Sequence, residues 1–96
     1  MKFEINKARE NVLNIAKRIG YIPQHSTENR EVVLVRPLER GGYPRFHLYV
    51  AEAGDKLVFN LHLDQRRPSY AGSHAHSGEY DGELVHGEAK RIQAII

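Results

Sequence analysis

The chain has 96 residues, of which 41% are hydrophobic and 27% charged, so we expect residues 1–96 to fold as a single domain with one modest core. It contains no cysteine, which excludes a disulfide framework, a thiolate metal site and a cysteine nucleophile. Its formal net charge is only +2, which is too weak to indicate nucleic-acid binding by itself.

The first ten residues mix charged and apolar side chains and lack the apolar core of a signal peptide. No apolar run in the chain approaches the roughly 20 residues that a membrane-spanning helix needs. We therefore expect a cytoplasmic protein that has no membrane segment.

The first predicted element is an amphipathic helix from about Glu4 to Ile19. Its apolar residues recur at spacings of three and four, the pattern of one buried helix face. These residues are Ile5, Ala8, Val12, Ile15 and Ile19. Gly20 is a suitable C-terminal stop, and Pro23 prevents the helix from continuing.

Two short strands are expected next. Tyr21-Ile22 opens the first, and residues 26–30 form the turn that follows it. The β-branched segment Glu31–Arg36 forms the second, and Pro37 limits this strand to an end or an edge of the sheet.

The clearest β structure is a hairpin of Tyr43–Val50 and Leu57–Asp64 around a turn at Ala53-Gly54. A symmetric turn pairs apolar residues on one face: Val50 with Leu57, Leu48 with Phe59, and Phe46 with Leu61. On the other face it pairs Tyr49 with Val58, His47 with Asn60, Arg45 with His62, and Tyr43 with Asp64. A slip by one residue would expose the apolar set, so burial excludes it.

Residues 65–80 lack periodicity, which predicts a long loop of the kind that often carries function. A C-terminal helix from about Gly82 to Ile95 follows, with Asp81 as a candidate cap. The order helix, three or four strands, helix predicts an α+β fold of α-β-β-β-α type. In this fold both helices cover one face of an antiparallel meander sheet, and the other face is open.

The open face is expected to carry a group of polar and aromatic side chains. They are Tyr43, Arg45, His47, Tyr49, Asn60, His62 and Asp64. One interpretation is a metal site formed by His62 and Asp64, which project from the same side of a strand, together with His74 and His76 from a folded-over loop. Imidazole and carboxylate groups suit a divalent metal such as zinc, manganese, iron or nickel.

A second interpretation is metal-free acid–base chemistry on a phosphodiester, as in a small ribonuclease-like enzyme. Histidine titrates near neutral pH and can act as general acid or base. The candidate catalytic residues are His47, His62 and His76, with His74 beside them. Arginine side chains can hold the phosphate oxygens, and the candidates are Arg45, Arg66 and Arg67.

A third interpretation is RNA binding without catalysis, in which bases stack on tyrosine rings and arginines contact phosphates. The candidate tyrosines are Tyr43, Tyr49, Tyr70 and Tyr80. The ligand-binding set is Tyr43, Arg45, Tyr49, Asn60, Arg66 and Arg67. A fourth interpretation is structural: a second copy of the chain, in a homodimer, or the loop itself covers this face. The sequence leaves these four alternatives open.

Three segments are dense in functional side chains: Tyr43–Tyr49, Asn60–Tyr70 and Ser73–Tyr80. Together they resemble a small uncharacterised prokaryotic protein family over nearly the whole chain; that family has no known activity, so no catalytic residue follows. The element order is similar to double-stranded-RNA-binding domains and to HicA-type mRNA-cleaving toxins. Gly72-Ser-His74 resembles a Gly-Ser-His stretch of the toxins, where it precedes the middle strand. Here it follows the last strand, so the resemblance assigns no role to His74.

Overall fold

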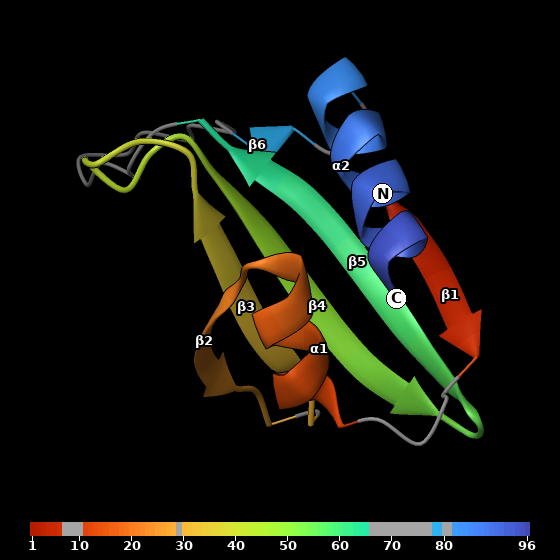
Figure 1. Cartoon of the computed structure of the whole chain (residues 1–96). Helices are drawn as coiled ribbons and strands as arrows, with labels where there is room; N and C mark the ends of the chain where they lie inside the picture. The colour runs from red at the N-terminus through yellow and green to blue at the C-terminus, as the bar shows by residue number, and fades with distance from the viewer. Residues whose placement is uncertain (7–10, 29, 66–77, 80–81) are drawn as a thin grey trace.

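The computed structural model describes residues 1–6, 11–28, 30–65, 78–79 and 82–96. The elements in chain order are β1 (Lys2–Asn6), α1 (Val12–Ile19), β2 (Ile22–Ser26), β3 (Val32–Pro37), β4 (Arg45–Ala53), β5 (Lys56–Asp64), β6 (Gly78–Glu79) and α2 (Glu83–Ile95). All of these strands belong to one antiparallel sheet in the order β1-β5-β4-β3-β2, with β6 also beside β5. Both described helices lie on the same side of this sheet (Figure 1). The predicted α+β class is confirmed, with more strands than the three or four expected.

The N-terminal segment is a strand where the sequence pattern predicted the first turns of a helix. β1 pairs with β5 along an edge of the sheet, with Phe3 opposite Phe59. The two rings stack with centroids 5.0 Å apart and planes 2° apart. The prediction of a helix from Glu4 was therefore wrong. Alternation of polar and apolar residues in β1 fits a strand, and pairing with β5 gives Phe3 a buried partner.

The helical part of the prediction is confirmed over α1, which is eight residues long. The side chain of Asn11 caps its start by accepting a hydrogen bond from the N–H of Asn14 at 2.8 Å. Gly20 ends it with a φ of 84°, and its N–H donates to the carbonyl of Ala16 at 2.9 Å. Four side chains face the core: Val12, Ile15, Ala16 and Ile19.

The hairpin of β4 and β5 has its predicted faces but not its predicted register. Gly54 and Asp55 form the turn, because Ala53 pairs with Lys56, and Gly54 has the positive φ of 66° that a tight turn favours. The observed pairs are Val50 with Phe59, Leu48 with Leu61, Phe46 with Leu63, Tyr49 with Asn60, His47 with His62, and Arg45 with Asp64. The pairing is offset by two residues from the prediction, and such an offset keeps every side chain on its face.

The core lies between the helices and one face of the sheet. The strands contribute Phe46, Leu48, Val50, Leu57, Phe59, Leu61 and Leu63, and all of these side chains are buried. From the helix side, Ile15, Ile19, Val85, Ala89 and Ile92 pack against them. Burying one Leu or Phe side chain stabilises the folded state by about 1.5–3 kcal/mol. These apolar residues therefore determine which face of the sheet packs against the helices. Phe46 and His47 lie on opposite faces, as predicted.

The second face is less open than the sequence suggested. Val33 and Val35 pair with Tyr49 and His47, so they share this face, yet they are only 0% and 3% exposed. His62 is also buried, and most of the other polar residues of this face are half-buried. Part of this burial is mutual, because Tyr49 stacks on His47 and His62, and the two imidazoles lie tilted against each other.

The C-terminal helix α2 begins after Gly82, which serves as its N-cap without a side-chain hydrogen bond. Asp81, the predicted cap, lies outside the described residues. Of the predicted loop 65–80, only Gln65 and β6 are described. Within the described part of the chain, neither helix is long and apolar enough to cross a membrane.

Candidate functional site

Pairing of β4 with β5 brings four polar residues together on the sheet face opposite the helices. His47 lies directly opposite His62, and Arg45 lies directly opposite Asp64. His62 and Asp64 are two residues apart on one strand, so their side chains project from the same face. The observed register therefore gathers two imidazoles, a guanidinium and a carboxylate at the end of the hairpin that is remote from its turn.

The carboxylate of Asp64 holds both imidazoles. Its Oδ2 atom lies 3.1 Å from Nδ1 of His47, and its Oδ1 atom lies 3.1 Å from Nε2 of His62. One nitrogen of each ring and one carboxylate oxygen lie within 4.8 Å of one another. We call His47, His62 and Asp64 the His–His–Asp cluster.

Ring stacking fixes the orientation of the two imidazoles. The ring centroids of His47 and His62 are 4.8 Å apart. Tyr49 stacks on both, at 4.9 Å from His47 and 5.7 Å from His62. Because three rings and one carboxylate restrain one another, little side-chain entropy remains to be lost when a ligand binds.

Burial lowers the pKa of both histidines, and Asp64 opposes this effect only in part. Positive charges nearby act in the same direction as burial: Arg45 on His47, and the N-terminal ammonium on His62. Both imidazoles are therefore neutral at pH 7. An ionised carboxylate only accepts hydrogen bonds, so the N–H groups that face Asp64 are Nδ1 of His47 and Nε2 of His62.

Arg45 lies beside the cluster and is held from two directions. Its Nε atom is 3.5 Å from Oδ2 of Asp64. Its guanidinium carbon lies 4.6 Å from the centroid of the Tyr43 ring, which is a cation–π contact. The arginine thus contacts the carboxylate of Asp64, while its own side chain remains 25% exposed.

The residues predicted from the sequence are distributed unevenly. His47, His62, Asp64, Arg45, Tyr43 and Tyr49 come together in and around the cluster. Asn60 lies on the same face, opposite Tyr49. The other candidates, Arg66, Arg67, Tyr70, His74, His76 and Tyr80, lie outside the described residues. The predicted metal set of His62, Asp64, His74 and His76 did not include His47, because the predicted register paired His47 with Asn60.

A second carboxylate cluster lies on the helix side of the sheet and was missed by the sequence interpretation. Glu88 of α2 accepts hydrogen bonds from Tyr21 at 2.6 Å, from Arg36 at 3.2 Å, and from Arg91 at 2.8 and 2.9 Å. Arg91 also donates to the carbonyl of Ile19 at the end of α1. This network, the Glu88 cluster, ties both helices to β3.

The electrostatics of the Glu88 cluster suit a structural role. Burial alone would raise the pKa of Glu88, but hydrogen bonds from Arg91 and Tyr21 and the charge of Arg36 outweigh burial and hold this pKa below its ordinary value. Burial and the contact with Glu88 raise the pKa of Tyr21, which keeps the hydroxyl protonated as a donor. A sequence signal existed, since Glu88 continues the helical spacing of Val85, Ala89 and Ile92.

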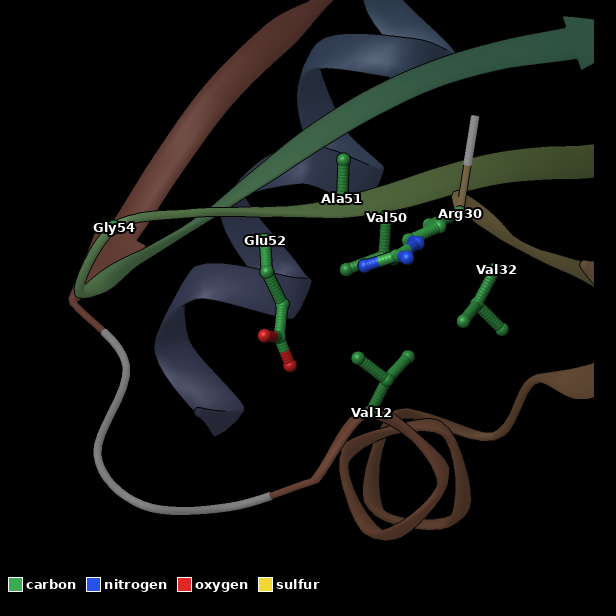
Figure 2. A pocket seen from close by; sticks show the side chains of 7 residues that line it. All are labelled: Val12, Arg30, Val32, Val50, Ala51, Glu52 and Gly54. Atoms are coloured by element: carbon green, nitrogen blue, oxygen red, sulfur yellow. The ribbon is translucent and has the colours of Figure 1, made fainter. Parts of the chain in front are cut away.

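A pocket of about 490 Å³ opens near the β4–β5 turn, away from both clusters. Figure 2 shows Val12 and Val32 pointing into this space, with Arg30 and Glu52 at its sides. The remaining lining residues are Val50, Ala51 and Gly54. None of these residues belongs to the His–His–Asp cluster, so the pocket is a separate feature and lacks its chemistry.

No protein-family model matches the chain, and no curated protein or solved structure matches it at a significant level. The resemblances inferred from sequence segments therefore stay predictions. The chemistry of the described residues is what supports a function.

Proposed function

We propose that this chain binds one divalent transition-metal ion through His47, His62 and Asp64, with zinc as the test ion. The observation that carries the proposal is the convergence of one nitrogen from each ring and one carboxylate oxygen within 4.8 Å. Burial keeps both imidazoles in the neutral form, which is the form that binds a metal.

The spacing of the hydrogen-bonded atoms supports this proposal. Zinc binds nitrogen and oxygen at about 2.0–2.2 Å, so two ligands of a tetrahedral site are about 3.3 Å apart. The separations of His47 Nδ1 and His62 Nε2 from the oxygens of Asp64 are both 3.1 Å. The three ligand atoms lie within 4.8 Å of one another, so they would draw together around the ion, and each imidazole would carry its proton on the ring nitrogen that faces away from the metal.

Three protein ligands leave at least one coordination position for another group. Two histidines and one carboxylate with an open position are a ligand set that suits zinc and iron enzymes. His74 and His76 remain the proposed source of a further protein ligand. Hydrolytic or redox activity would depend on which group takes this position, so we propose metal binding and no particular reaction.

The geometry favours a metal over metal-free cleavage of a phosphodiester. In-line displacement needs a general base and a general acid on opposite sides of the phosphorus atom. The rings of His47 and His62 are 4.8 Å apart and both face Asp64, so they approach a substrate from the same side.

The other expectations have less support. RNA binding would need exposed stacking rings, but Tyr49 already stacks on both histidines. Homodimer formation and a cytoplasmic location stay predictions, because no contact among the described residues bears on them.

Equilibrium dialysis of untagged protein against zinc tests the proposal. We expect one zinc per chain for the wild type and a loss of affinity of at least tenfold for His47→Ala, His62→Ala and Asp64→Asn. His86→Ala is the matched control, because it removes an exposed imidazole of α2 and should bind zinc as the wild type does. Equal, weak binding by all five proteins would contradict a built site.

The double variant His74→Ala/His76→Ala tests whether residues 65–80 supply another ligand. If they do, zinc affinity falls by at least tenfold while the one-to-one stoichiometry is kept. If the affinity is unchanged, the site consists of the three described ligands and exogenous groups.

A further inference from the structure

Arg45 is positioned to bind a ligand in addition to its contact with Asp64. Its Nε atom faces Asp64, and its guanidinium packs against the Tyr43 ring. Within the described parts of the chain, its two η nitrogens have no hydrogen-bond or ion-pair partner, and together they carry four N–H donors. The arginine is thus oriented, partly exposed, and has donors available next to the His–His–Asp cluster.

Charge indicates what these donors would bind. Asp64 and Arg45 carry opposite charges that cancel, and an imidazole that binds a metal is neutral. A bound divalent ion would bring the site to a net charge of about +2 in a half-buried environment. The complementary ligand is a dianion that offers several oxygen atoms.

We propose that the metal-loaded site binds a phosphate group. One phosphate oxygen completes the coordination of the metal, and others accept hydrogen bonds from the η nitrogens of Arg45. This inference rests on the proposed metal site. A planar guanidinium binds two oxygens of a phosphate side by side, which a lysine cannot do, and that explains an arginine at this position.

Phosphate fits the site better than a carboxylate does. A phosphate monoester carries close to two negative charges at neutral pH, which match the net charge of the loaded site. A carboxylate carries one charge and has two oxygens, so it could not serve the metal and both η nitrogens equally well. Binding should therefore depend on the metal and on Arg45 together.

The test uses cobalt(II) in place of zinc, because its visible absorption bands respond to a change of ligand. Inorganic phosphate is titrated into the cobalt-loaded full chain and, separately, into the metal-free chain by calorimetry. We expect the wild type to show a saturable spectral change and a phosphate affinity at least tenfold higher with the metal than without it. Equal affinity with and without the metal, or an unchanged spectrum, would overturn the proposal.

The variant Arg45→Met separates this inference from the metal site itself. At a cobalt concentration that saturates both proteins, phosphate affinity should fall at least tenfold in Arg45→Met, and Arg45→Lys should lie between Arg45→Met and the wild type. Arg18→Met, on the exposed side of α1, is the matched control. Failure of the wild type to bind cobalt would refute the metal site. Undiminished phosphate binding by Arg45→Met would refute only the inference about phosphate.

The source of the phosphate group is resolved by three ligands compared under the same conditions: inorganic phosphate, a nucleoside monophosphate and a 5′-phosphorylated RNA oligonucleotide. Binding of any of them that needs both the metal and Arg45 supports the proposal, and the tightest one identifies the source. If the cobalt-loaded wild type binds none of the three, the proposal is wrong.

Discussion

The two carboxylates Glu88 and Asp64 gather polar partners on opposite faces of the same sheet, with different consequences. Glu88 is bound by two arginines and a tyrosine hydroxyl, and its side chain is 4% exposed. Asp64 is bound by two neutral imidazoles and, at 3.5 Å, by one arginine. Arginine stays protonated and has no lone pair to offer, whereas a neutral imidazole has one nitrogen whose lone pair can bind a metal ion.

This difference separates the cluster that joins distant parts of the fold from the cluster that we propose binds a metal. The partners of Glu88 come from α2, β3 and the segment after α1, so the Glu88 cluster joins elements that are distant in sequence. Among the described residues, the partners of Asp64 all come from one hairpin, which other contacts already hold together. Changes at Glu88 should therefore reduce stability, and changes at Asp64 should mainly reduce binding.

The largest effect is expected from Glu88→Gln. Removing the charge leaves Arg36 and Arg91 without their counterion inside the structure, which typically costs about 3–5 kcal/mol when a buried ion pair is broken. Because both arginines are about one-third exposed, we expect the lower end, about 3 kcal/mol, in urea unfolding. Glu83→Gln, on an exposed position of α2, is the control. A loss below about 1 kcal/mol would mean that the Glu88 cluster does not hold the helices.

Zinc should stabilise the protein only by binding to the His–His–Asp cluster. At a free zinc concentration 100 times the dissociation constant, a ligand that binds only the folded state adds about 2.7 kcal/mol to the free energy of unfolding. We expect this increment for the wild type and for Glu88→Gln, its reversal by a chelator, and an increment lower by at least about 1.3 kcal/mol in Asp64→Asn, which corresponds to a tenfold loss of affinity. An equal increment in Asp64→Asn would place the zinc elsewhere.

The pH dependence of the metal-free protein should separate the clusters. Burial lowers the pKa of His47 and His62 below 6.5, so on acidification the unfolded chain takes up protons first and stability falls below about pH 6.5. The pKa of Glu88 lies below 4.5, so its contribution is present above that pH and is lost as the pH falls through the lowered pKa.

Unfolding free energies measured from pH 8 to pH 3 check this prediction. The variant His47→Asn/His62→Asn should no longer lose stability just below pH 6.5, but should still lose stability below pH 4.5. The variant Glu88→Gln should lose stability just below pH 6.5, but should lack the further loss below pH 4.5. Stability of the wild type that rises between pH 6.5 and pH 5 would contradict the direction of the histidine shifts.

The smallest effect is expected from Arg45→Met. Its contact with Asp64 is 3.5 Å long and partly exposed, and ion pairs of this kind contribute about 0–1 kcal/mol. We expect a loss below about 1 kcal/mol in urea unfolding. Arg91→Met should cost clearly more, because Arg91 binds both oxygens of Glu88 and the carbonyl of Ile19. Equal losses would remove the distinction between a structural and a ligand-binding arginine.

Much of the fold could be predicted from local patterns. Gly20 marked the end of α1, and the spacing of apolar residues marked α2. The strand β1 was missed because Ile5 also fits a helical spacing, and only pairing with β5 makes the alternation of Phe3 and Ile5 decisive. The position of Glu88 on the buried face of α2 could have been predicted, but its partners could not, since they come from three separate segments.

For the candidate site, the alternating pattern of the strands was enough to show which side chains share a face. Side chains alternate along a strand with a period of two, so burial of Leu61 and Leu63 is enough to place His62 and Asp64 on the opposite face. Which residues become neighbours across the hairpin was decided by the tertiary structure. An offset of two residues leaves every apolar side chain buried, so the hydrophobic pattern cannot distinguish the two registers. The turn at Gly54 and Asp55 selects the register in which His47 meets His62 and Arg45 meets Asp64.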